Sequence, residues 1–166
     1  MVENWRLEMV ISGGQTGVDR AALDVALECD IEISGYCPRG RKAEDGKIPD
    51  KYPLMETDSE DYEARTEKNV EISDGTLILN VGQLTGGTAV TVGFARKHGK
   101  PVFTVQLDRD RPDAGEECRQ WLRENRIRIL NVAGPRASKT AGIYARAARA
   151  LRGVFGALGK QSQGGV

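Results

Sequence analysis

The sequence has few of the side chains that serve as nucleophiles, bases or soft metal ligands. Its 166 residues include one histidine, His98, and three cysteines, Cys29, Cys37 and Cys118. Irregularly spaced cysteines in odd number argue for reduced thiols in a cytoplasm, not for a disulfide framework. His98 precedes Gly99 at an expected helix end, where a cation stabilises the helix dipole. We do not expect cysteine catalysis, because His98 is the one histidine that could pair with a thiol. Because Cys37 has no cysteine or histidine partner at ligand spacing, we expect no structural zinc site either.

Charge of one sign and long apolar runs are also missing. The 24 Lys and Arg residues balance 24 Asp and Glu residues, so no global field recruits nucleic acid or an anionic membrane. No apolar stretch approaches the roughly 18 residues needed to span a bilayer. We therefore expect a cytoplasmic protein with a small-molecule partner and with no nucleic-acid or membrane partner.

Short β-branched runs alternate along the chain with helical stretches. This order indicates an α/β fold in which a doubly wound parallel sheet of about five strands lies between two helical layers. One domain should cover residues 1–158, with a frayed tail at 159–166. The expected strands are Leu7–Ser12, Ile31–Tyr36, Gly75–Val81, Val102–Leu107 and Ile127–Val132, and the expected helices are Val18–Glu28, Asp61–Ile72, Ala89–His98, Ala114–Asn125 and Thr140–Phe155.

Two glycine-threonine turns each stand between an expected strand and an expected helix. Such turns expose backbone N–H groups to an anion at the positive end of a helix dipole. Neither has the Walker lysine or the three-glycine dinucleotide spacing. Each could be only a tight turn, and its threonine only a helix N-cap. Together they predict a phosphorylated, nucleotide-like ligand held by Gly13, Gly14, Gln15, Thr16, Gly17, Thr85, Gly86, Gly87 and Thr88.

The shared ligand also predicts the order of the strands. In open α/β sheets, ligands bind beyond the carboxyl ends of strands at a topological switch point. If both glycine turns hold one ligand, the first and third strands should be neighbours. This gives the order 2-1-3-4-5, with 3-2-1-4-5 as the alternative.

Cationic side chains supply further expected ligand contacts. Arg39 and Arg41 lie in an expected loop at residues 37–56, and a loop of that length usually belongs to a site or is disordered. Arg65 and Asn69 are four residues apart on an expected helix and share a face, where they could clamp an anion and a ring edge. The alternative for the loop that carries Arg39 and Arg41 is a solvated turn without a ligand. The alternative for Arg65 is an ion pair on the protein surface.

Many short blocks, in the same order along the chain, resemble the putative molybdenum carrier family. The resemblance covers residues from about 8 to 155. It implies a Rossmann-like fold, molybdenum cofactor (molybdopterin) as the bound ligand, and a homo-oligomer. The matching blocks are Ser12–Ala21, Gly35–Arg41, Ala43–Gly46, Arg65–Thr66, Asn69–Val70, Ser73–Thr76, Gly86–Thr88 and Asn131–Arg136.

The same resemblance extends to the lysine-decarboxylase-like phosphoribohydrolases, which are related to this family. Those enzymes carry a Pro-Gly-Gly-x-Gly-Thr-x-x-Glu turn, whereas here Thr85 stands at the proline and no glutamate follows Thr88 in register. The resemblance therefore implies a carrier with no catalytic residue. The alternatives are a nucleoside-monophosphate phosphoribohydrolase, which would draw its carboxylate from Glu44, Asp45 or Asp19, and a nucleotide-sensing interaction module.

Overall fold

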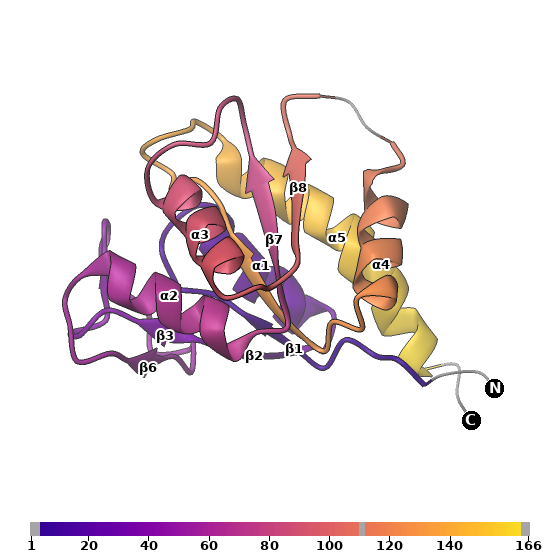
Figure 1. Cartoon of the computed structure of the whole chain (residues 1–166), viewed down its shortest axis with the longest axis horizontal. Coiled ribbons are helices and arrows are strands. Elements are labelled where there is room, and N and C mark those ends of the chain that lie inside the picture. The colour runs from indigo at the N-terminus through magenta and orange to yellow at the C-terminus, as the bar shows by residue number, and fades with distance from the viewer. Residues whose placement is uncertain (1–3, 110–111, 164–166) are drawn as a thin grey trace.

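The central feature of the computed structural model is a sheet of five parallel strands in the order β2-β1-β9-β7-β8 (Figure 1). The structure describes residues 4–109 and 112–163, with side chains to residue 158. The strands are β1 (Met9–Ile11), β2 (Glu32–Ser34), β7 (Gly75–Asn80), β8 (Val102–Gln106) and β9 (Ile129–Ala133). Each lies within or next to an expected strand, so the α/β fold is confirmed.

The last strand, β9, occupies the centre of this sheet. It pairs with β1 through Met9 and Ile129 and with β7 through Thr76 and Asn131. In the numbering of the five expected strands the order is 2-1-5-3-4, so both predicted orders are wrong. A shared ligand does not require adjacent strands, because strands lie roughly 4.8 Å apart and three strand ends span only about 10 Å.

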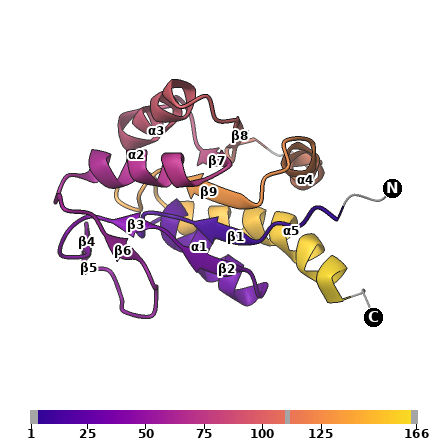
Figure 2. The ribbon, with the colours of Figure 1, turned by 60° about the horizontal axis from the view of Figure 1, so that its bottom comes forward.

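Helices cover both faces of the sheet (Figure 2). α2 and α3 pack side by side on one face, while α1 and α4 both contact α5 on the other. The helices are α1 (Val18–Glu28), α2 (Tyr62–Ile72), α3 (Gly86–Lys97), α4 (Ala114–Glu124) and α5 (Ile143–Gln163). This three-layer arrangement is the doubly wound architecture that the periodicity predicted, and it has the Rossmann-like fold that the family resemblance implied. Within the described part of the chain, no helix is long and apolar enough to cross a membrane.

Helix α5 continues beyond its predicted end at Phe155 to Gln163. The predicted frayed tail at 159–166 therefore starts inside this helix, and residues 164–166 lie outside the described residues. The buried side chains of Leu151, Val154 and Phe155 anchor the helix on the core. A glycine inside a helix costs only about 1 kcal/mol, so Gly156 does not end it.

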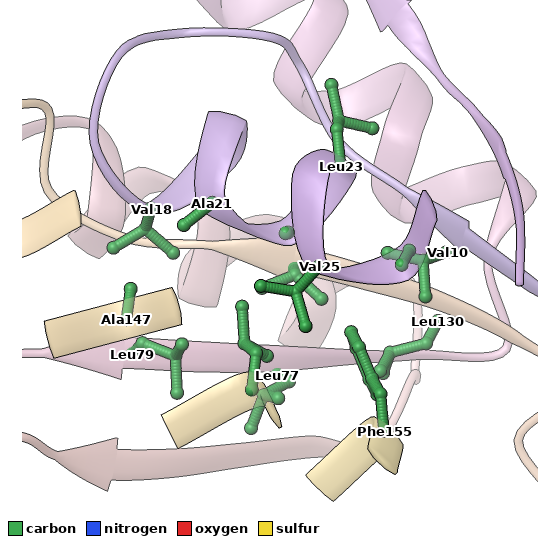
Figure 3. Packing of buried hydrophobic residues seen from close by; sticks show 14 of the residues in the cluster. Val10, Val18, Ala21, Leu23, Val25, Leu77, Leu79, Leu130, Ala147 and Phe155 are labelled. Atoms are coloured by element: carbon green, nitrogen blue, oxygen red, sulfur yellow. The ribbon is translucent and has the colours of Figure 1, made fainter. Parts of the chain in front are cut away.

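The core lies between the sheet and the helices α1 and α5 (Figure 3). All residues of β7 are buried, as expected for a parallel strand covered on both faces. Leu77 of β7 and Leu130 of β9 are fully buried, and Val25 of α1 and Phe155 of α5 belong to the same cluster. This packing fixes the carboxyl ends of the central strands.

The long loop at residues 37–56 is ordered by two small sheets and by Arg41. β3 (Tyr36–Cys37) pairs with β6 (Met55–Glu56), and β4 (Lys42–Ala43) pairs with β5 (Gly46–Lys47). The Arg41 guanidinium donates hydrogen bonds to four carbonyl oxygens of this loop, at 2.8–3.1 Å, those of Ile48, Pro49, Tyr52 and Leu54. Arg41, predicted to contact an anion, instead holds its own loop together.

Replacing Arg41 with Ala should lower the free energy of unfolding by about 2 kcal/mol or more, because hydrogen bonds from a charged donor contribute about 1.5–3 kcal/mol each. Arg41→Lys should recover little, since one ammonium cannot reach four carbonyls in the geometry of a guanidinium. Lys47→Ala is the control, because its exposed ion pair with Asp50 contributes about 0–1 kcal/mol. Urea denaturation measures all three, and equal small losses for Arg41→Ala and Lys47→Ala would contradict this role.

Candidate functional site

A cavity of about 500 Å³ opens at the carboxyl ends of β1, β9 and β7. Four segments line it: the first glycine turn with the start of α1, the first two turns of α2, the second glycine turn with α3, and the connection from β9 to α5. Open α/β sheets bind their ligands at this edge. The cavity is therefore the candidate binding site of the protein.

The structure brings part of the predicted set to this cavity. The predicted residues that line it are Gly13, Gln15, Arg65, Asn69, Thr85, Gly86, Gly87 and Thr88. Those that do not line it are Gly14, Thr16, Gly17, Arg39 and Arg41. Arg39 faces another loop, where its Nη1 donates a hydrogen bond to the carbonyl of Asp58 at 3.2 Å.

The sequence-based prediction missed the connection from β9 to α5. Residues 131–136 and Lys139 line the cavity between the two glycine turns. The block Asn131–Arg136 contributes to the family resemblance, but the assumed strand order placed its strand at the edge of the sheet. Because β9 lies at the centre, this connection supplies cations at the middle of the site.

The first glycine turn uses its backbone donors internally. The Gly14 N–H donates to Ser12 Oγ at 3.2 Å, the Gln15 N–H to Asp19 Oδ2 at 3.2 Å, and the Thr16 N–H to Gln15 Oε1 at 3.0 Å. Consecutive amides that already have partners are poor anion receptors. The geometry of this turn therefore does not support its predicted use as a phosphate cradle.

Glu44 ties the first turn to the β9–α5 connection. Its carboxylate accepts hydrogen bonds from the hydroxyl of Thr16, from the Ser138 N–H at 3.1 Å and from Ser138 Oγ at 2.5 Å. Its Oε2 also lies 3.5 Å from Arg136 Nε. These hydrogen bonds, that of the Ser138 hydroxyl first among them, lower the pKa of Glu44. Glu44 is thus an ionised clamp for the loop that carries Arg136 and Lys139.

The second glycine turn leaves its backbone donors accessible. Helix α3 begins at Gly86, and the N-cap residue Thr85 makes no side-chain capping hydrogen bond. Gly86 and Gly87 are exposed and line the cavity, and the first N–H groups of a helix have no partner within the helix. Gly86 has φ 55°, and a Cβ there would collide with Lys139 Nζ. Glycine at this position therefore allows the ammonium to approach the positive end of α3.

Arg65 lies at the floor of the cavity. Its side chain is 10% exposed, and its Nη1 donates to the Gly13 carbonyl at 2.6 Å and lies 3.8 Å from Asp19 Oδ2. A Cβ on Gly13 would collide with this guanidinium, which explains why glycine stands there. The alternative of an exposed ion pair with Glu63 or Glu67 does not describe Arg65, because the group is buried.

Asn69 links α2 to the strand β3. Its Oδ1 accepts a hydrogen bond from the Tyr36 N–H at 2.7 Å, and its Nδ2 donates to the Tyr36 carbonyl at 3.0 Å. The amide thus pairs with the backbone of Tyr36 as a neighbouring strand would. It borders the cavity, but its first role in the structure is to position α2.

Asp19 is the buried acid of the site. Burial raises its pKa from 3.8 to about 6, against the opposing attraction of Arg65 and the hydrogen bond from Gln15. Desolvation of the charged form therefore outweighs the nearby guanidinium. A carboxyl group with this pKa exchanges its proton close to neutral pH, next to any ligand that enters the cavity.

Asp19 should make stability depend on pH in a direction opposite to most carboxylates. Because its pKa is higher in the folded state, the folded protein binds this proton more tightly, and the contribution to stability grows as pH falls from about 7 to about 4. Relative to Asp19→Asn, the parent should gain up to about 3 kcal/mol over this range, at roughly 1.4 kcal/mol per pKa unit. Urea denaturation of both proteins at each pH measures the difference between their free energies of unfolding. The contributions of the other titratable groups are the same in both proteins and cancel in this difference. A difference independent of pH would contradict the raised pKa.

Comparison with known proteins places the fold and the cavity in a family. A crystal structure described as a putative molybdenum carrier protein from Syntrophus aciditrophicus SB is 47% identical, with a TM-score of 0.87 over 90% of this chain and 94% of the other. This confirms the resemblance drawn from the sequence. Comparison with curated proteins found no match. The model of a family described as "Circularly permutated YpsA SLOG family" matches residues 10–155, which include every residue that lines the cavity. The chain therefore belongs to the circularly permutated YpsA SLOG family.

Proposed function

We propose that this protein binds and carries a phosphorylated, ring-bearing small molecule in the cavity. The observation that supports this most is the convergence of cations and an uncapped helix end on one space. The N-terminus of α3, Lys139, Arg136 and Arg65 all border the cavity. Backbone N–H groups and cations at a helix N-terminus form a favourable environment for a phosphate group.

The phosphate would lie at the end formed by α3 and the β9–α5 connection. There it would accept hydrogen bonds from the N–H groups of Gly86–Thr88 and from Lys139. Arg136 is 47% exposed and can turn from Glu44 to an incoming anion. Arg65 already donates to Gly13 and would strengthen the site mainly through its charge.

The ring would lie toward the start of α2. This wall presents the carboxylates of Asp61 and Glu63 and the ring of Tyr62. Amino and ring N–H groups of a pterin or purine could donate to such carboxylates, and the planar ring could contact Tyr62. A volume of about 500 Å³ suits a ligand of this size.

Molybdenum cofactor combines a pterin, a phosphate and a metal that its own dithiolene already binds. The protein would therefore need no molybdenum ligand of its own. The name of the 47% identical relative supports a ligand that contains molybdenum. In this proposal the carrier acts in the cytoplasm as a homo-oligomer, and both of these points stay predictions.

Two substitutions separate ligand binding from folding. Lys139→Ala should weaken binding of a phosphorylated ligand by about ten- to a hundredfold, because one charge-assisted contact contributes about 1.5–3 kcal/mol. Gly87→Ala should also weaken binding, since its methyl group would enter open space in the cavity. Gly87 has no left-handed φ, so alanine in this helix should leave stability unchanged or slightly higher. Arg149→Ala, exposed on α5 outside the cavity, is the control.

Calorimetric titration with molybdenum cofactor, molybdate, AMP and inorganic phosphate would test both variants. Tight binding of molybdenum cofactor alone supports a cofactor carrier, and tight binding of AMP points to a nucleotide ligand. Binding of molybdate without binding of the other three compounds would indicate an oxyanion carrier. Indifference to all four, or parent-like affinity of Lys139→Ala, would contradict a phosphate site at α3.

Asp19 favours a second candidate function, hydrolysis of a nucleoside monophosphate. Of the three carboxylates considered for this reaction, Asp19 lines the cavity, while Glu44 clamps a loop and Asp45 lies 2.6 Å from Arg20. Water would replace the base at the ribose carbon, giving free base and ribose 5-phosphate, with Asp19 as the acid or base. Base release from AMP that is lost in Asp19→Asn would support it. No release across a panel of nucleotides would exclude it.

A further inference from the structure

A cluster of two carboxylates and one imidazole lies between α2 and α3, outside the cavity. Glu67 and Glu71 are one turn apart on α2, and His98 is the C-cap residue of α3. One ligand atom from each lies within 4.8 Å of the others. The expected C-cap position of His98 is confirmed, but its ring also faces two carboxylates from the neighbouring helix.

The imidazole of His98 has a buried nitrogen without a hydrogen bond. Its Nε2 makes none with any residue in the described part of the chain, although the atom is buried. Oε1 of Glu67 and Oε1 of Glu71 both lie 3.7 Å away, beyond normal hydrogen-bond distance. A buried polar atom without a partner costs free energy, and a group between the three atoms would give Nε2 a partner.

The spacing fits a small cation. Protein ligands of Zn²⁺ lie about 2.0–2.2 Å from the ion, so two ligand atoms of a tetrahedral site are roughly 3.4 Å apart. The observed 3.7 Å from Nε2 to each carboxylate oxygen is close to this value, and inward movement of the side chains would bring all three atoms, now within 4.8 Å of one another, to an ion. Imidazole with carboxylates suits Zn²⁺ and other first-row transition ions, whereas Mg²⁺ and Ca²⁺ prefer oxygen ligands.

We propose that Glu67, Glu71 and His98 bind a divalent transition ion, Zn²⁺ in the first place, which joins α2 to α3. Water would complete its coordination. The sequence suggested no metal site, because the ligands come from two helices that are distant along the chain. The site does not depend on the proposed carrier function.

Lys97 competes with the ion for Glu67. Its Nζ lies 3.3 Å from both carboxylate oxygens of Glu67. The Lys97 side chain is 62% exposed, so it can turn into solvent when the ion binds. Removing this ammonium should therefore increase the affinity for the metal ion. If the residues formed only an ion-pair cluster, removing Lys97 would take away one contact and would not increase metal affinity.

The position of the ion would affect the ligand cavity through the helices. The first two turns of α2 carry Arg65 and Asn69, and the first turns of α3 carry Thr88 and Thr91, all of which line the cavity. Glu71 and His98 lie farther along these helices, and Glu67, between Arg65 and Asn69 in the sequence, projects from another face of α2. An ion there would fix their packing and so the width of the cavity, without contacting the ligand.

The proposal can be tested by titrating chelator-treated protein with Zn²⁺. The absorption spectrum of bound Co²⁺ reports the ligand set, and Mg²⁺ is the control ion. The parent should bind one equivalent of Zn²⁺ and melt at a higher temperature with it. Glu71→Gln and His98→Gln should each weaken binding at least tenfold. Lys97→Ala should tighten it severalfold, while Arg96→Ala, one residue earlier on α3, should not.

Three outcomes would overturn the site. One is Zn²⁺ affinity that is the same in the parent, Glu71→Gln and His98→Gln, which would place any bound ion elsewhere. The second is weaker Zn²⁺ binding by Lys97→Ala than by the parent, and the third is no stoichiometric binding by the parent. The Glu71 side chain is 41% exposed, so Glu71→Gln should fold even if His98→Gln does not. Melting of the metal-free variants checks this.

Discussion

The site depends on the backbone pairing of β9 with both β1 and β7. These two ladders place the end of the last strand between the ends of the first strand and of β7. Three connections therefore meet at one edge of the sheet: the first glycine turn, the β9–α5 connection and the second glycine turn. If β9 were at the edge of the sheet, Arg136 and Lys139 would be far from the N-terminus of α3.

Desolvation then gives the floor of the cavity its electrostatic character. Arg65 and Asp19 are both buried there, and burying charge is costly unless other groups compensate. The Gly13 carbonyl and the Gln15 N–H provide part of this compensation. It is incomplete for Asp19, whose pKa is raised to about 6. The floor can thus give or take a proton while the rim carries cations.

The two glycine turns look alike in sequence but play different parts. In the first, the amides of Gly14, Gln15 and Thr16 bond to side chains, and the turn supports the β9–α5 connection through Glu44 and Thr16. In the second, Thr85 leaves the helix end uncapped and Gly86 admits Lys139. The N–H partners in the first turn are local, but the contacts that give the two turns their different surroundings, with Glu44 in the first and Lys139 in the second, come from distant segments.

The sequence by itself determined the alternation of strands and helices, since apolar periodicity and glycine stops are local properties. Helix α1 was predicted with its observed bounds, and the glycines and Arg65 were placed at one edge of the sheet. Tertiary structure alone decided the position of β9, the role of Arg41 in its own loop, and the meeting of His98 with Glu67 and Glu71. The first and the last depend on contacts between residues far apart in the chain, and the role of Arg41 depends on the folded path of an irregular loop. Local periodicity carries no information about either.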